Sequence, residues 1–178
     1  AETVMHRVLA AMVMFSAGAM AASADSRSSD AVAERLQKKM VEVRQEFSDV
    51  AHVSTSTLSE TLEDTLVIDV RKADEFAVSR IPGAVHAPNT ESLLEIAGTA
   101  GDRPIVVYCS LGVRSSIAVR ELESAGYESV SNLDGSLFLW ANEGRPLVND
   151  AGETDKAHPF NAWWGRYLEG FLHAYKPD

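Results

Sequence analysis

The sequence of 178 residues contains a single cysteine, Cys109. One cysteine cannot form a disulfide within the chain, and it leaves no set of cysteines and histidines at zinc-site spacing. Basic residues are also few, since 16 lysines and arginines stand against 26 aspartates and glutamates, giving a net charge of −10. This balance argues against nucleic acid or an anionic membrane surface as a partner. It does not exclude a small anionic substrate, because a local group of donors can oppose the global field.

Residues 1–24 have the pattern of a secretory signal peptide. Met5-His6-Arg7 precedes an apolar run over residues 8–22, and Ala22-Ser23-Ala24 has the small-x-small form of a cleavage site. The alternative is an uncleaved membrane anchor, for which the run is short, because a span needs about 20 apolar residues. We therefore expect a periplasmic or secreted protein that has no membrane contact after cleavage.

Residues 25–49 are expected to form a linker and an amphipathic helix. Asp30 is a plausible helix N-cap, and apolar residues then recur at spacings of three and four. The members of this stripe are Val32, Leu36, Met40, Val43 and Phe47. Such a stripe packs against the rest of the domain, or alternatively binds a partner.

Residues 50–148 alternate short apolar segments with short helical patterns. Strands are expected at 50–53, 66–71, 85–86, 105–108 and 127–130, and helices at 56–63, 73–77, 90–98, 115–125 and 136–142. Strands that alternate with helices predict an α/β fold with a largely parallel sheet and helices on both faces.

Residues 149–178 form a tail that is rich in aromatic side chains. Trp163, Tyr167 and Phe171 would share one face of a helix. That helix either covers apolar surface of the domain or presents an exposed aromatic patch to a partner protein.

The candidate nucleophile is Cys109, which follows the β-branched run 105–108 and precedes a short loop containing Gly112 and Arg114. Ligands bind at the carboxyl ends of strands in open α/β sheets. A loop that curls over the sulfur would turn backbone N–H groups inward, and the following helix and Arg114 would add positive charge. The predicted binding residues are Ser110, Leu111, Gly112, Val113 and Arg114. These groups favour a thiolate and an anionic substrate; the alternative is a small buried cysteine in an ordinary turn.

Several separated motifs then resemble one family. They are Asp69-Val70-Arg71, Glu75-Phe76, Arg80-Ile81-Pro82-Gly83-Ala84, Tyr108-Cys109 with Arg114-Ser115, Gly126-Tyr127, Leu133-Asp134-Gly135, and Trp140. In this order and spacing, residues 50–148 resemble a single rhodanese domain. The resemblance implies a doubly wound sheet of five parallel strands with the nucleophile after the fourth strand. It also implies sulfurtransferase chemistry, with sulfane sulfur carried as a cysteine persulfide and with no metal or organic cofactor.

The sequence departs from the family pattern at two places. Ser79-Arg80 stands where Gly-His is frequent, and Gly135-Ser136 where Gly-Gly is frequent. Neither is expected to touch the nucleophile. Relatives that act on phosphate or arsenate esters have a longer loop between cysteine and arginine, so the four residues found here favour sulfur transfer over phosphatase or arsenate reductase activity.

The resulting hypothesis is a two-step transfer. The Cys109 thiolate takes sulfur from an anionic donor such as thiosulfate, and a thiol or cyanide acceptor then removes it. Arg114 would orient the donor, and Arg71 would either reach the site or pair with Glu75. Asp69 is expected to hold loops by hydrogen bonds, with Ser115 in a supporting role. The competing hypothesis is a non-catalytic module that binds anions or a persulfidated partner through this loop, with the tail as its docking surface.

Overall fold

The computed structural model describes residues 26–177, so the predicted signal segment 1–24 lies outside the described part. A helix runs through residues 26–46. The strands are β1 (His52–Val53), β2 (Leu66–Asp69), β3 (Val85–His86), β4 (Ile105–Tyr108), β5 (Val130–Leu133), β6 (Leu147–Asn149) and β7 (Gly152–Thr154). The helices are α2 (Thr55–Thr61), α3 (Ala73–Val78), α4 (Thr90–Ala97), α5 (Val113–Ser124) and α6 (Ser136–Asn142), with 3₁₀ turns η1 (Leu62–Asp64), η2 (Trp164–Tyr167) and η3 (Gly170–Leu172).

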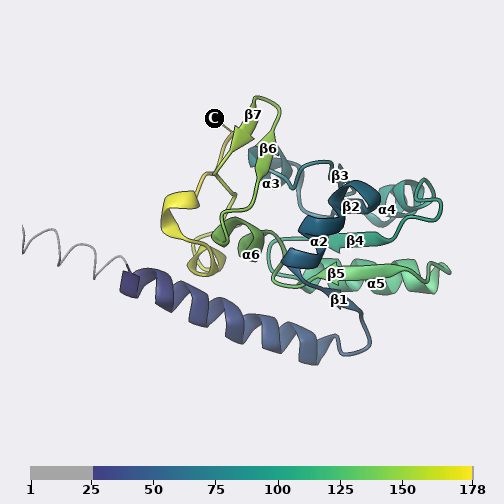
Figure 1. Cartoon of the computed structure of the whole chain (residues 1–178), viewed down its shortest axis with the longest axis horizontal. Coiled ribbons are helices and arrows are strands. Elements are labelled where there is room, and N and C mark those ends of the chain that lie inside the picture. The colour runs from purple at the N-terminus through teal and green to yellow at the C-terminus, as the bar shows by residue number, and fades with distance from the viewer. Residues whose placement is uncertain (1–25, 178) are drawn as a thin grey trace, which may run out of the picture.

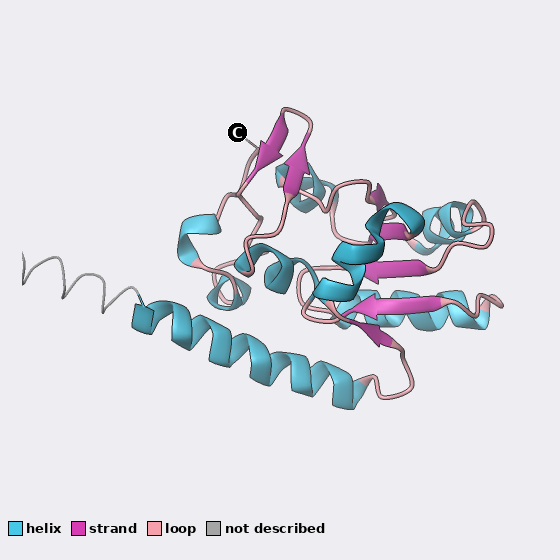
Figure 2. Cartoon of the chain, in the orientation of Figure 1, coloured by secondary structure: helices cyan, strands magenta, loops and turns pink. Residues whose placement is uncertain are grey.

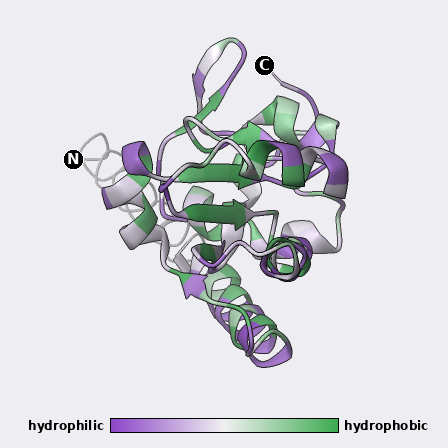
Figure 3. Cartoon of the chain, turned by 90° about the vertical axis from the view of Figure 1, so that its right-hand side faces the viewer, coloured by the Kyte–Doolittle hydropathy of each residue, from purple (hydrophilic) through white to green (hydrophobic). Residues whose placement is uncertain are grey.

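Five strands form one sheet in the order β1-β5-β4-β2-β3, and each neighbouring pair is parallel. The central strands β2 and β4 are buried along their whole length, which explains why their residues are apolar except for Asp69 at the end of β2. Figure 3 shows strands inside the domain coloured as hydrophobic. Alternate side chains face opposite sides: Val106 and Tyr108 belong to one core, and Val107 to the other. The predicted doubly wound parallel sheet is confirmed.

Helices cover both faces of this sheet (Figures 1 and 2). One core packs α4 and α5 against the sheet through side chains such as Leu93 and Leu122. The opposite core contains α2, α6 and the C-terminal segment, with Leu58, Trp140 and Leu172 among its members.

The N-terminal helix packs along the edge of the domain beside β1 (Figure 1). All five residues of the predicted stripe are buried, and they contact both cores: Leu36 and Met40 on one side, and Val43 and Phe47 on the other. Packing against the domain is therefore confirmed. The predicted cap at Asp30 is wrong, because residues 26–29 are already helical.

Several other element boundaries differ from the sequence prediction by a few residues, and two of these differences have a clear cause. Ser54, rather than Ser56 or Thr57, caps α2 by accepting a hydrogen bond from the Thr57 N–H. The last strand of the sheet begins at Val130 rather than at Tyr127, because the Tyr127 N–H bonds back to Leu122 to close the end of α5.

The tail does not form the single helix that the sequence predicts. Leu168 is extended (φ −112°, ψ 138°) and separates η2 from η3, so Trp163, Tyr167 and Phe171 do not share a face. Tyr167 is buried, whereas Trp163 and Phe171 are 64 % and 68 % exposed. The tail therefore covers part of the domain, and its use as a docking patch stays a prediction.

Within residues 26–177, no helix has both the length and the apolar character needed to cross a bilayer.

Candidate active site

The Cys109 loop lies at the carboxyl end of β4 and leads into α5, as the sequence predicts. The first turn of α6 holds this loop from behind, since the N–H groups of Leu137 and Phe138 donate to the carbonyls of Cys109 and Ser110, both at 3.1 Å. The two ends of a trans peptide unit point in opposite directions. The N–H groups of Ser110 and Leu111 are therefore directed away from α6.

The Cys109 sulfur is surrounded by hydrogen-bond donors. The Gly112 N–H lies 3.1 Å from Sγ, and the Ser115 hydroxyl lies 3.4 Å from it. Gly112 reaches this position with φ of +102°, which glycine adopts at little cost. Burial by itself raises the pKa of the Cys109 thiol, but the Arg114 charge and the hydrogen bonds from Ser115 and Gly112 outweigh it, so the pKa is lowered.

The Ser115 hydroxyl belongs to a longer hydrogen-bond chain. It lies 2.6 Å from Asn132 Oδ1, so this oxygen competes with the Cys109 sulfur for its single proton. Asn132 Nδ2 lies 3.1 Å from Nδ1 of His52, whose Nε2 lies 3.2 Å from the Phe47 carbonyl. Because a carbonyl only accepts, neutral His52 carries its proton on Nε2, and its Nδ1 accepts from Asn132. This arrangement keeps Oδ1 directed at Ser115.

Arg114 is anchored by Glu75, a carboxylate from the first turn of α3. Its two terminal nitrogens lie 2.9 Å and 2.8 Å from the Glu75 oxygens, and the Ser110 hydroxyl donates to the same carboxylate at 2.9 Å. Glu75 is 1 % exposed, and burial by itself raises its pKa; the hydrogen bonds and charge of Arg114 nevertheless lower it to about 2. Arg114 therefore stays beside Cys109, and the carboxylate of Glu75 balances much of the positive charge of Arg114.

Arg71 and Asp69 form a buried structural pair at the end of β2. The Arg71 guanidinium donates to Asp69 at 2.7 Å and to the carbonyl of Ser79 at 2.6 Å. Both side chains are fully buried. The role expected for Asp69 as a holder of loops agrees with these contacts. Arg71 neither pairs with Glu75 nor reaches the pocket, because the adjacent carboxylate of Asp69 holds it inside the fold.

A pocket of about 300 Å³ opens over Cys109. Its lining residues are Cys109, Ser110, Leu111, Val113, Arg114, Phe160 and Trp164. Since only 2 % of Cys109 is exposed, a substrate reaches its sulfur through this pocket.

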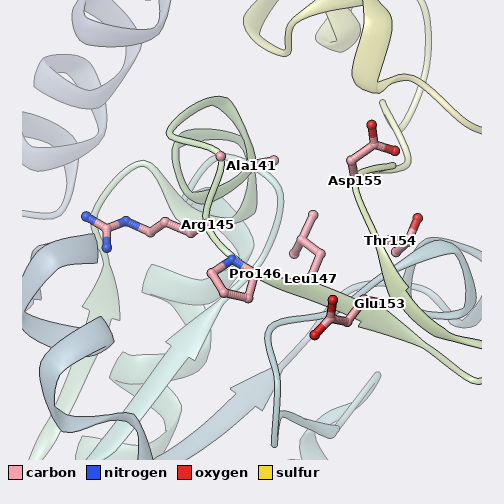
Figure 4. Close-up of a pocket in the computed structure, with 8 residues that line it drawn as sticks. Ala141, Arg145, Pro146, Leu147, Glu153, Thr154 and Asp155 are labelled. Carbon is pink, nitrogen blue, oxygen red and sulfur yellow. The ribbon is translucent and has the colours of Figure 1, made fainter.

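A second hollow, of about 420 Å³, lies beside α6 and the β6–β7 hairpin (Figure 4). Figure 4 shows the Arg145 side chain directed away from Glu153 and Asp155, so no set of polar groups converges there. Within residues 26–177, no three or more histidine, cysteine or carboxylate side chains gather as metal ligands.

The family model described as Rhodanese-like domain matches residues 54–143, half of the chain. The chain belongs to this rhodanese-like family. A sulfurtransferase of Allochromatium vinosum is 35% identical over 106 residues, which cover 58% of this chain and 99% of that protein. The thiosulfate sulfurtransferase GlpE of Shewanella oneidensis is 33% identical over 97 residues, covering 53% and 95%. A thiosulfate sulfurtransferase structure from Pseudomonas aeruginosa superposes with a TM-score of 0.55 at 25% identity, covering 62% of this chain and 22% of that one.

One departure from the rhodanese pattern does touch the nucleophile. Ser136, which stands where the family often has glycine, accepts a hydrogen bond from the Cys109 N–H at 3.2 Å. Its φ of +50° lies in the left-handed region, and its hydroxyl also donates to the Leu133 carbonyl at 3.2 Å. The expectation that this departure lies away from the nucleophile is therefore wrong.

Sequence reasoning did not identify Glu75, Asn132, Phe160 and Trp164 as residues of this rhodanese-like site. Glu75 had a usable signal: it lies in the first turn after β2, and β2 neighbours β4, so both carboxyl ends meet at one edge. Phe160 and Trp164 had no local signal, because their position depends on how the tail folds back.

Proposed function

We propose that the protein is a sulfurtransferase that carries sulfane sulfur as a persulfide on Cys109. Family membership and relatives named as sulfurtransferases support transferase activity. The observation that carries the proposal is the Cys109 sulfur itself, which faces the Gly112 N–H and the Ser115 hydroxyl beside the Arg114 charge. A thiolate is the form of cysteine that attacks sulfur.

In the first step, the Cys109 thiolate attacks the outer sulfur of an anionic donor such as thiosulfate. A new S–S bond forms, the donor's S–S bond breaks, and its electron pair leaves with sulfite. In the second step, a thiolate or cyanide attacks the outer sulfur of the persulfide, and the electron pair returns to Cys109. No external oxidant or reductant is needed, and donors directed at the sulfur stabilise the negative charge in both steps.

Arg114 is proposed to orient the donor's oxygens from the side of the pocket. Its side chain is 35% exposed, so it remains accessible while it is held by Glu75. The non-catalytic binding module and the phosphatase or arsenate reductase are the competing functions. In the short Cys109 loop, the Gly112 N–H donates to the sulfur of Cys109. A loop of this size suits a single sulfur atom, and this supports sulfur transfer over phosphatase or arsenate reductase activity.

Mass spectrometry of the intact protein tests this function. Protein incubated with thiosulfate should gain the mass of one sulfur atom, lose it when cyanide is added, and release thiocyanate. The Cys109→Ser variant should do none of these. A protein that gains no sulfur and hydrolyses an aryl phosphate would instead be a phosphatase, and one that does neither would be a binding module.

We also propose that the protein acts in the periplasm or outside the cell, on the basis of the segment 1–24. Amino-terminal sequencing of the protein from fractionated cells tests this location. A chain that begins after Ala21 or Ala24 in the periplasmic or extracellular fraction supports it, whereas a cytoplasmic chain that retains residues 5–24 contradicts it.

A further inference from the structure

The C-terminal segment folds back over the catalytic loop. The family match ends at residue 143, yet Phe160 and Trp164 line the pocket together with Cys109. Figure 1 shows this segment, in yellow, on the side to which the strands of the main sheet point. The pocket over the sulfur is therefore completed by residues outside the rhodanese-like match.

Phe160 is held in place by specific contacts. Its φ of +66° lies in the left-handed region, which is uncommon for a bulky residue and is found where the surroundings fix the backbone. Its N–H donates to His158 Nδ1 at 3.0 Å, which requires His158 to be neutral, and burial lowers the pKa of His158. Two cations flank its ring: the Arg114 guanidinium carbon lies 5.2 Å from the centroid, and the Lys72 ammonium 5.3 Å.

Trp164 is held by the other parts of the tail and by the N-terminal helix. Its backbone N–H donates to Asn161 Oδ1 at 3.0 Å, and its ring packs against the core beneath it. The Lys39 ammonium of the N-terminal helix lies 5.8 Å from the ring centroid. The 3₁₀ turn η2 that contains Trp164 is tied to α6, because the Asn142 side chain donates to the carbonyl of Tyr167 at 2.9 Å. The two aromatic rings are therefore fixed parts of the pocket wall.

The wall that results is apolar. Leu111, Val113, Phe160 and Trp164 supply hydrocarbon and aromatic surface, and the one charged lining group, Arg114, already binds Glu75. A pocket of about 300 Å³ is at the small end of the range for small-molecule sites. It therefore has room for a compact molecule. Apart from Arg114, where the donor's oxygens are proposed to lie, the wall of this pocket gains free energy by burying apolar surface.

We propose that Phe160 and Trp164 are specificity-determining residues that make the pocket select, as sulfur acceptor, a small thiol with an apolar stem. The inference rests on the proposed function, because it concerns the second step of that reaction. The acceptor thiolate attacks the outer sulfur of the Cys109 persulfide, the S–S bond to Cys109 breaks, and the acceptor leaves as its own persulfide. The apolar stem lies against the rings during this attack.

Two acceptors of similar size and thiol basicity test the proposal: 1-butanethiol, with an apolar stem, and 3-mercaptopropionate, with a charged one. Full-length protein is first loaded with thiosulfate and freed of excess donor, and mass spectrometry confirms one added sulfur. The rate of sulfur loss in a single turnover is then measured against acceptor concentration. We expect the natural chain to prefer butanethiol, and Phe160→Ala or Trp164→Ala to reduce that preference about tenfold, a size typical of lost contacts in an apolar pocket.

Trp163→Ala is the matched control, because Trp163 is adjacent, 64 % exposed and not part of the pocket lining. It should keep the preference of the natural chain. Phe160→Leu and Trp164→Phe retain apolar surface and should keep most of the preference for butanethiol. If the thermal transition shows that an alanine variant does not fold, these two variants replace it in the test. A natural chain without preference, an unchanged preference in the alanine variants, or an equal loss in Trp163→Ala would overturn the inference. If the natural chain takes up no sulfur from thiosulfate, the proposed function fails instead.

Discussion

Replacing Glu75 with glutamine would test how the charges of the site are arranged. Glu75 is 1 % exposed, binds both terminal nitrogens of Arg114, and accepts from the Ser110 hydroxyl. Glutamine keeps the shape of the side chain but removes its negative charge. The variant therefore separates the contribution of the buried ion pair from that of packing.

The expected effect on stability follows from the pKa of Glu75. This pKa lies at about 2 in the folded protein, against an ordinary value of 4.5. Each unit of pKa difference is equivalent to 1.36 kcal/mol, so the ionised carboxylate stabilises the folded state by about 3 kcal/mol. Because the folded pKa is the lower one, this contribution is complete above about pH 4.5 and is lost as the pH falls towards 2.

Urea unfolding between pH 2 and pH 7 measures this contribution. We expect Glu75→Gln to be less stable than the natural chain by about 3 kcal/mol at pH 7, and the two curves to converge near pH 2. The natural chain should lose more stability over this range than the variant does. Other carboxylates titrate in both proteins, so the difference between the curves is the quantity of interest.

The same variant should change the reactivity of Cys109. With its counter-charge removed, Arg114 would exert more of its positive charge on the sulfur, and the pKa of the thiol should fall further. The pH dependence of alkylation by iodoacetamide measures this pKa. Parallel stability curves for the two proteins, together with an unchanged alkylation midpoint, would refute the argument that this ion pair governs the site.

Four further substitutions test other parts of the structure. Ser115→Ala should raise the thiol pKa, because a hydroxyl that donates to the Cys109 sulfur is lost; an unchanged alkylation midpoint would contradict this. Gly112→Ala should cost more than the ~1–2 kcal/mol of left-handed strain alone, because its Cβ would lie 3.2 Å from a buried amide nitrogen. Gly126→Ala has a similar φ of +97° but open space around it, and urea unfolding of both variants separates crowding from strain. Leu36→Ala should lower the free energy of unfolding by about 2–4 kcal/mol, because Leu36 is 2 % exposed; a negligible loss would mean that the N-terminal helix is not part of the folding unit.

The sequence by itself determined the features that depend on neighbouring residues. The apolar runs of β2 and β4, the period of the N-terminal stripe, and the strand–loop–helix around Cys109 all follow from residues that are close together in the sequence. Alternation of strands with helices predicted the parallel sheet, since a parallel pair needs a crossover between its strands. These features were recoverable because main-chain geometry fixes which side chains share a face.

Tertiary structure decided which distant groups meet at the sulfur. Glu75 reaches Arg114 because β2 and β4 are neighbours in the sheet. Arg71 binds Asp69, two residues before it, and does not enter the site. Whether the tail formed one helix or two turns depended on the surface it covers, since a short aromatic segment gains more from burial than from helix propensity. Phe160 thus reaches the pocket through a backbone conformation that local sequence preferences disfavour, and contacts of its ring with the distant Arg114 and Lys72 help to hold it there.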